Sequence, residues 1–92
     1  MTDKKYLDMI PPEIEDILGE IFELGYKGRG HPLGGWISQS MSHHLGKSVG
    51  HIGKFLCGST DEPHLYCAMW RLCIAATIYR RSIIKCYTDN RY

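Results

Sequence analysis

The sequence has almost no net charge and no apolar run long enough to cross a membrane. Eleven Lys and Arg side chains stand against ten Asp and Glu side chains, which gives a formal charge of +1 at pH 7. This balance excludes a generally basic nucleic-acid coat, so an anion site must arise from local charge placement. The apolar stretch from Leu65 to Tyr79 is fifteen residues long and is interrupted by Arg71, whereas a membrane-spanning helix needs about 20. No basic segment is followed by an apolar run near the start of the sequence, so we expect no signal peptide.

Paired cysteine motifs are also missing. The four cysteines have no C-x-x-C spacing: Cys57, Cys67, Cys73 and Cys86. The last three fall in one predicted helix, and their spacing places them on different faces. We therefore expect reduced thiols in a cytoplasmic protein rather than a disulfide framework. A zinc site built from Cys57, His64, Cys67 and Cys73 would lack the paired-ligand spacing of such sites.

The spacing of apolar residues predicts an all-α fold. One domain spans residues 1–92, and its three main helices cover residues 12–24, 36–57 and 62–86. Pro11 and Pro12 are typical of a helix start, and Gly25 is typical of a helix end. An N-cap acid at Asp61 followed by Pro63 predicts the start of the last helix. The fold class is therefore a small bundle of three main helices.

Size and the last helix together predict a homo-oligomer. A chain of 92 residues buries only about 60–65% of the surface that its unfolded form exposes, so an isolated monomer is marginal. The helix over residues 62–86 is apolar almost all round, which favours burial of a second face against another subunit. We therefore expect the subunits to associate through helices.

Arg71 is a marked residue on this last helix. It is the only charge between His64 and Arg80. A guanidinium among apolar neighbours must be paired, because an isolated buried charge is too unfavourable. Its partner is either an internal acid, such as Glu20 or Glu23, or an anionic ligand.

The helix predicted over residues 36–57 has two unlike faces. One arc is apolar and is expected to form the core: Ile37, Met41, Leu45, Val49, Ile52, Phe55 and Leu56. The opposite arc is polar or cationic and holds no acid: Ser40, His43, Lys47, His51 and Lys54. Gly46, Gly50 and Gly53 each cost about 1 kcal/mol relative to alanine in a helix interior. We expect them to admit a neighbouring helix or a ligand, with a break near Gly46 as an alternative.

The order of several motifs resembles a known family. The motifs are LDMIPPE at residues 7–13, LGYK at 24–27, a glycine-containing loop ending at Trp36, His51 followed by residues 55–58, and Asp61-Glu62 followed by His64-Leu65. Over about residues 6–80 this order is similar to the phage dATP/dGTP diphosphohydrolase N-terminal domains. The resemblance implies an all-α domain that handles purine nucleotides in the cytoplasm of a phage-infected bacterium. The chain departs from the family at Cys67, where the pattern has a second histidine.

Hydrolysis of a nucleoside triphosphate usually needs Mg²⁺ held by several carboxylates. The acid pairs Glu13/Asp16 and Glu20/Glu23 both lie on the first helix, and the later helices contribute no such pair. A histidine-based site is the other route, with His51, Asp61 and His64 as the candidate metal ligands of an enzyme. Mg²⁺ is expected only in that enzymatic case.

Binding without hydrolysis asks only for cations facing the phosphates and an aromatic face for the base. The predicted ligand-binding residues are Tyr26, Trp36, Ser40, His43, Lys47, His51, Lys54, His64 and Arg71, with Tyr66 and Tyr79 as further aromatic candidates. We expect no catalytic residue, no cofactor, and neither a membrane nor a DNA or RNA polymer as partner. The sequence thus predicts a phage protein that sequesters a host immune signalling nucleotide, of cyclic oligonucleotide or ADP-ribose type. The alternatives are a Mg²⁺-dependent dATP/dGTP diphosphohydrolase and a module that binds a host protein.

Overall fold

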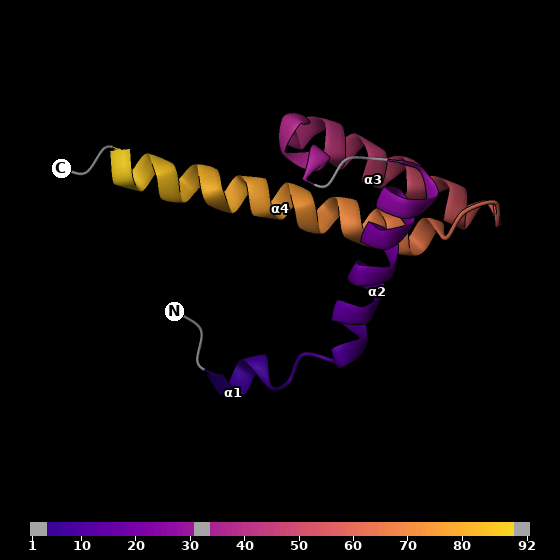
Figure 1. Cartoon of the computed structure of the whole chain (residues 1–92), viewed down its shortest axis with the longest axis horizontal. Coiled ribbons are helices and arrows are strands. Elements are labelled where there is room, and N and C mark those ends of the chain that lie inside the picture. The colour runs from indigo at the N-terminus through magenta and orange to yellow at the C-terminus, as the bar shows by residue number, and fades with distance from the viewer. Residues whose placement is uncertain (1–3, 31–33, 90–92) are drawn as a thin grey trace.

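A computed structural model describes residues 4–30 and 34–89, with side chains placed for residues 6–30 and 34–83. Its elements are α1 (Lys4–Leu7), α2 (Pro12–Glu23), the π-helical turn η1 (Leu24–Gly28), the 3-10 turn η2 (Gly35–Ser38), α3 (Met41–Leu56) and α4 (His64–Asp89) (Figure 1). The described residues contain no strand. The prediction of an all-α fold with three main helices is confirmed.

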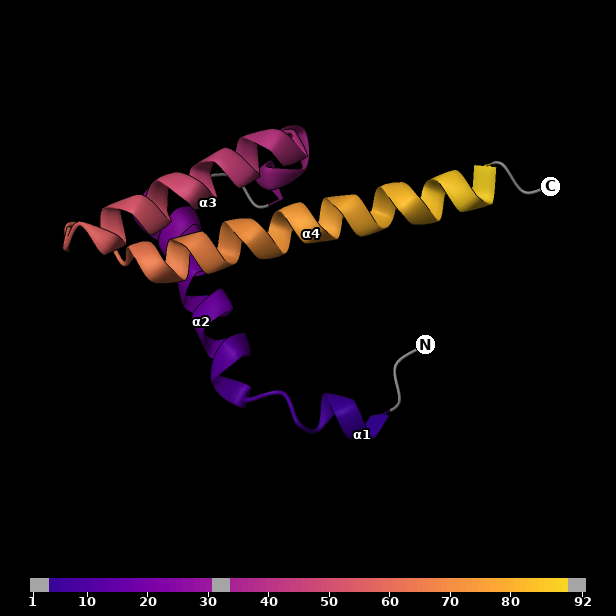
Figure 2. The same cartoon turned by 180° about the vertical axis from the view of Figure 1, so that it is seen from behind.

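The three main helices meet at the first part of α4. Helix α3 runs alongside that part in the opposite direction, and α2 crosses it (Figures 1 and 2). Helix α1 and the second half of α4 extend away from this junction (Figure 2). The radius of gyration is 15.4 Å, against about 12 Å for a compact domain of this length. The chain is therefore elongated and leaves much of its helical surface uncovered.

Local signals set the ends of α2 and the start of α3, with two corrections to the predicted limits. Pro12 begins α2, as predicted, but the helical path continues through a π-helical turn to Gly28 rather than ending at Gly25. The helix predicted from residue 36 begins at Met41, because residues 35–38 form a separate 3-10 turn and the next residue is extended. Ser40 then caps α3, and its hydroxyl accepts a hydrogen bond from the backbone N–H of His43 at 3.1 Å.

Helix α3 is continuous from Met41 to Leu56, so the alternative of a break near Gly46 is wrong. It ends in a Schellman turn around Gly58, whose φ of 82° suits glycine. The N–H of Gly58 donates to the carbonyl of Phe55, and the N–H of Ser59 donates to that of Lys54, both at 3.0 Å. These two bonds fix the direction in which the chain leaves α3 toward α4.

Helix α4 covers His64–Asp89 instead of the predicted 62–86. Asp61 does not cap it through the backbone; its carboxylate accepts from Ser59 and contacts the ring of His64. The side chain of Cys86 and residues 90–92 lie outside the described part of the chain. Over the described helices, none combines the length and the hydropathy that a bilayer crossing requires.

The seam between α3 and α4 is small and half polar. Six described residues are buried, three of them polar: His44, Ser48, His64, Cys67, Ala68 and Ala75. Ser48 donates from its hydroxyl to the carbonyl of Ala68 across the seam at 3.0 Å. Small residues on α4 allow this approach, and the buried polar groups are satisfied by partners on the other helix.

The predicted core face of α3 is wrong. Its apolar residues are exposed except for the half-buried Met41: Ile37, Leu45, Val49, Ile52, Phe55 and Leu56. Val49 is 69% exposed and Leu56 78% exposed. The helix instead turns His44, Ser48 and His51 toward α4, because each of these side chains finds a hydrogen-bonding partner there.

The glycines of α3 do not admit a neighbour within this chain. A Cβ atom added at Gly46, Gly50 or Gly53 would meet nothing within 4 Å. The expectation of a close helix or ligand at these positions is therefore not met by the single subunit.

Candidate functional site

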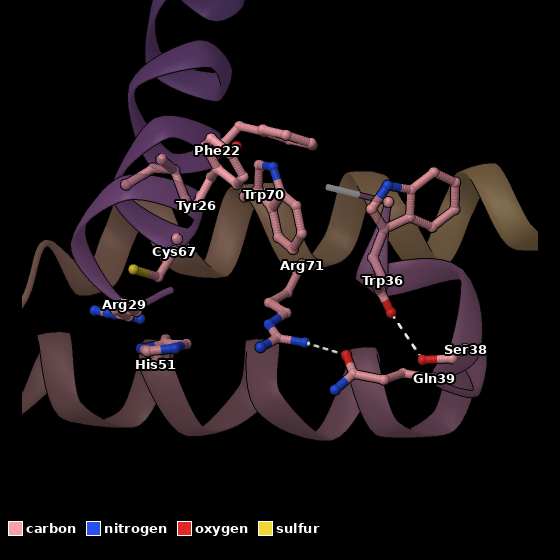
Figure 3. Close-up of a pocket in the computed structure, with 14 residues that line it drawn as sticks. Phe22, Tyr26, Arg29, Trp36, Ser38, Gln39, His51, Cys67, Trp70 and Arg71 are labelled. Carbon is pink, nitrogen blue, oxygen red and sulfur yellow. Dashed lines mark hydrogen bonds between the residues drawn. The ribbon is translucent and has the colours of Figure 1, made fainter. Parts of the chain in front are cut away.

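A cavity of about 300 Å³ lies where α2, η1, η2, α3 and α4 come together (Figure 3). Four aromatic side chains line it: Phe22, Tyr26, Trp36 and Trp70. The rings of Phe22 and Trp70 meet edge to face with centroids 6.1 Å apart. The cationic or titratable lining residues are Arg29, His51 and Arg71, and no aspartate or glutamate is among the described residues of its wall. The cavity is thus aromatic and carries the positive charge of Arg71, while that of Arg29 is balanced by an ion pair with Glu62.

Arg71 lies between the aromatic cluster and α3, and it bonds only to neutral groups (Figure 3). Its Nη1 donates to Oε1 of Gln39 and to Nδ1 of His44, both at 3.0 Å. Its guanidinium carbon is 5.6 Å from the ring centroid of Trp70. None of the ion pairs among the described residues includes Arg71. Burial lowers the pKa of Arg71. Its guanidinium nevertheless stays protonated, because arginine does not lose its proton in proteins.

The internal acid considered for Arg71 is therefore not its partner. Glu23 pairs with Lys27 on the next turn at 3.1 Å, and Glu20 is exposed on α2. Of the two predicted partners of Arg71, an anionic ligand is the one that stays open.

His44 holds Arg71 in place. Its ring is fully buried, with Nε2 3.0 Å from the carbonyl oxygen of Trp36 and Nδ1 3.0 Å from the guanidinium of Arg71. A carbonyl only accepts and a guanidinium only donates, so Nε2 carries the proton and Nδ1 is the acceptor. His44 thereby ties α4 to η2, which carries the ring of Trp36 in the cavity wall.

A second polar cluster lies at the other end of the seam. The Nδ1 atoms of His51 and His64 are 2.9 Å apart, and Nε2 of His64 is 2.6 Å from Oδ1 of Asp61. His51, His64 and Glu62 place one ligand atom each within 4.8 Å of one another. Glu62 is also ion-paired with Arg29 from the cavity wall.

The charge states in this cluster follow from its contacts. The hydroxyl of Ser59 and the ring of His64 lower the pKa of Asp61 to about 2, so its carboxylate is ionised at neutral pH. Burial lowers the pKa of His51, and the positive charges around it add to this, while Glu62 opposes it. His51 is therefore mostly neutral at pH 7, which is the form that binds metals.

The structure distributes the predicted ligand-binding residues between the cavity and other places. Tyr26, Trp36, His51 and Arg71 line the cavity. Ser40 caps α3, and His64 lies outside the cavity wall, in contact with the ring of His51. The remaining three are exposed on α3, outside the cavity wall: His43, Lys47 and Lys54. Tyr66 and Tyr79 also lie outside it.

Several cavity residues were not anticipated from the sequence. Phe22 and Trp70 sit on apolar helix faces, where sequence periodicity assigns them to a core. Arg29 belongs to a glycine-rich loop whose path the sequence does not determine. Gln39 gave no signal, because an amide next to a helix start is ordinary.

The metal candidates also changed partners. His51 and His64 are brought together as expected, but Glu62 takes the place predicted for Asp61, which contacts the far side of the His64 ring. Of the zinc alternative, Cys57 and Cys73 are exposed free thiols and Cys67 is buried. None of these three belongs to the group that contains His64.

Comparison with family models, curated proteins and solved structures gives no match. The similarity to dATP/dGTP diphosphohydrolase domains thus stays a resemblance of motifs.

Proposed function

We propose that this protein binds a nucleotide in the cavity between α2 and α4. The observation that carries the proposal is Arg71, a cation in the wall of a cavity that has no lining carboxylate and whose own partners are all neutral. A partly buried charge without a counter-ion favours an anionic ligand, and guanidinium is well suited to phosphate. The aromatic rings supply stacking faces for a base. The volume is at the lower end for small-molecule sites.

Binding without cleavage is the form of the proposal that the cavity favours. The acids of α2 are exposed and do not line the cavity: Glu13, Glu15, Asp16, Glu20 and Glu23. Glu62 is engaged by Arg29. The set of carboxylates that Mg²⁺ requires is therefore not assembled around the proposed phosphate position. A site that holds a nucleotide without activating water is suited to sequestration.

The specific ligand class follows from this feature and from the motif resemblance. We infer a phage protein that sequesters a host immune signalling nucleotide, of cyclic oligonucleotide or ADP-ribose type, in the cytoplasm of the infected bacterium. Arg71 and the ring of His51 offer more than one polar contact to phosphate, which suits a ligand with two or more phosphates.

Homo-oligomerisation belongs to the same proposal. Apolar side chains are exposed on both long helices, among them Leu45, Val49 and Ile52 on α3 and Leu65 and Leu72 on α4. Burial of these side chains against a second copy would remove their apolar surface from water, which favours association. A native mass measurement of the assembly with its ligand tests both subunit number and ligand identity.

The decisive experiment uses Arg71→Gln, which keeps an N–H donor but removes the charge, with the exposed Arg80→Gln on the same helix as its matched control. We expect Arg71→Gln to raise the Kd for the nucleotide about 10- to 100-fold, because a hydrogen bond to a charged group contributes about 1.5–3 kcal/mol. Arg80→Gln should bind like the wild type. Equal Kd values for both variants, with unchanged helical circular dichroism, would show that the cavity is not the site.

A second candidate is the Mg²⁺-dependent dATP/dGTP diphosphohydrolase that the motif resemblance implies. The feature that favours it is Glu62, a carboxylate close to His51 of the cavity wall. Incubation with a nucleotide panel and Mg²⁺, followed by chromatography, separates the two. A ligand recovered intact after heat denaturation supports sequestration, whereas formation of monophosphate and pyrophosphate supports the enzyme. No thermal shift with any nucleotide would favour the host-protein module.

A further inference from the structure

We propose that His51, Glu62 and His64 form a binding site for a divalent transition-metal ion such as Zn²⁺, with Asp61 as the outer hydrogen-bonding partner of His64. The metal site does not include Arg71, the residue on which the nucleotide proposal rests. It goes beyond nucleotide binding and does not depend on it.

The imidazole rings of His51 and His64 lie close together. Their Nδ1 atoms are 2.9 Å apart, while two nitrogens bound to one tetrahedral zinc at about 2.0–2.1 Å lie roughly 3.3 Å from each other. A few tenths of an ångström therefore separate the present arrangement from that of two ligands on one ion. The rings come from different helices, His51 from α3 and His64 from α4. An ion between them would join the two helices.

The contact with Asp61 determines which nitrogen of His64 carries the hydrogen. Its Nε2 faces the carboxylate of Asp61 at 2.6 Å, and a carboxylate accepts, so Nε2 carries the hydrogen. The Nδ1 atom that faces His51 then holds a lone pair. A histidine that donates its distal N–H to a carboxylate is the usual arrangement behind a metal ligand, because the carboxylate fixes the tautomer and the ring orientation. Ser59 in turn donates to Asp61 at 2.7 Å and holds that carboxylate in place.

Glu62 supplies the proposed carboxylate ligand. Glu62 brings one oxygen within 4.8 Å of a ring nitrogen of each histidine. It precedes α4 by two residues, and its backbone carbonyl accepts from the N–H of His64 at 2.8 Å. This local bond holds Glu62 close to the histidine. The ion pair with Arg29 leaves its second oxygen available for a cation.

The donor set selects the kind of metal. Imidazole nitrogen is a good ligand for zinc and for the neighbouring transition metals, whereas Mg²⁺ and Ca²⁺ prefer sites made of oxygen. Two histidines and one carboxylate leave a fourth position for water or for a ligand oxygen, as in zinc sites that are not purely structural. Because His51 also lines the cavity, that open position borders the proposed nucleotide site.

The test titrates the full-length, chelator-treated protein with Zn²⁺ in a calorimeter, with no nucleotide present, and repeats the titration with Co²⁺ to read its visible absorption. We expect one Zn²⁺ per chain for the wild type. His51→Gln and Glu62→Gln each remove one proposed ligand and should weaken binding at least tenfold. Asp61→Asn, which alters only the outer partner, should weaken it about 10- to 100-fold.

His43→Gln is the matched control, because His43 is an exposed histidine on the same helix and lies outside the cluster. It should bind Zn²⁺ like the wild type. The buried His64 is left intact in all variants so that loss of folding does not imitate loss of binding. Absence of Zn²⁺ binding in the wild type would overturn the proposal, as would binding that survives in His51→Gln and Glu62→Gln but is lost in Cys67→Ser.

The outcome is separable from that of the nucleotide proposal. Zn²⁺ binding that depends on His51 and Glu62, without any nucleotide affinity, would support the metal site and refute the nucleotide pocket. Nucleotide binding that depends on Arg71, in a chain that takes up no Zn²⁺, would do the reverse.

Discussion

Among the described residues, His44 and His64 are the two fully buried large side chains, and they lie at opposite ends of the α3–α4 seam with different consequences. Both carry their hydrogen on Nε2, bound to an oxygen: the carbonyl of Trp36 for His44 and the carboxylate of Asp61 for His64. They differ at Nδ1. In His44 this atom accepts from Arg71, which has no alternative but to donate. In His64 it faces the ring of His51, which can either donate a hydrogen or turn a lone pair toward a cation.

The comparison shows that burial alone does not distinguish a structural histidine from a ligand. The partner on the second nitrogen does. A guanidinium occupies the lone pair of His44 permanently and makes that residue a brace for the cavity wall. The lone pair of His64 instead faces a second imidazole with a carboxylate beside it, and it can bind a cation when His51 presents its own lone pair. We therefore expect His44 and the His64 cluster to respond differently to Zn²⁺ and to substitution.

The largest effect is expected from Zn²⁺ on stability. An ion at a free concentration of about 100 Kd stabilises the folded state by about 2.7 kcal/mol if it binds only that state. We expect this gain in urea denaturation of the wild type and its loss in the double variant His51→Gln/Glu62→Gln. A gain that persists in the double variant would place the ion elsewhere.

The next effect tests the other buried histidine. His44→Leu removes the acceptor of Arg71 and the donor to the carbonyl of Trp36, and it should lower the free energy of unfolding by about 1–3 kcal/mol. The exposed His43→Leu serves as control and should stay within about 0.5 kcal/mol of the wild type. The Zn²⁺-induced gain should be unchanged in His44→Leu. A loss of Zn²⁺ binding there would mean that the two ends of the seam are not independent.

A smaller effect concerns the outer face of α3, between the two ends. Gly50→Ala should stabilise the subunit by about 0.5–1 kcal/mol, because alanine is the better helix former and its Cβ meets no atom within 4 Å. Denaturation at low protein concentration measures this value. Dissociation of the assembly by the same substitution would instead identify Gly50 as a contact between subunits.

The smallest effect on nucleotide binding is expected at Lys47, although the charge pattern predicts that this residue binds the ligand. Its side chain is exposed and does not line the cavity. Lys47→Glu should therefore change the nucleotide Kd less than about threefold, through weak long-range repulsion only. A change as large as that of Arg71→Gln would move the ligand out of the cavity and onto the outer face of α3.

Much of the fold was predictable from local signals. Pro11 and Pro12 mark the start of α2, and the apolar periodicity identifies three main helices. The isolated charge of Arg71 identified a residue that needs a partner, although both an internal acid and an anionic ligand stayed open as that partner. These properties depend on neighbours in the sequence or on a single side chain, which is why the sequence alone suffices for them.

The orientation of α3 was not predictable in this way. Hydrophobic periodicity assigns Val49 and Leu56 to the interior and gives no signal for His44. The observed orientation depends on partners that are far away in the sequence: Arg71 for His44, Ala68 for Ser48 and His64 for His51. The exchange of Asp61 for Glu62 near the histidines has the same origin, because adjacent acids in a turn point in different directions.

Cys67 gives this architecture a practical use. Its thiol is buried in the cavity wall, and burial raises its pKa, whereas Cys57 and Cys73 are exposed. Alkylating reagents attack the thiolate, so Cys67 should be modified much more slowly than the other two. The rate of its modification then becomes an internal gauge of cavity occupancy, readable by mass spectrometry without labelling any candidate ligand.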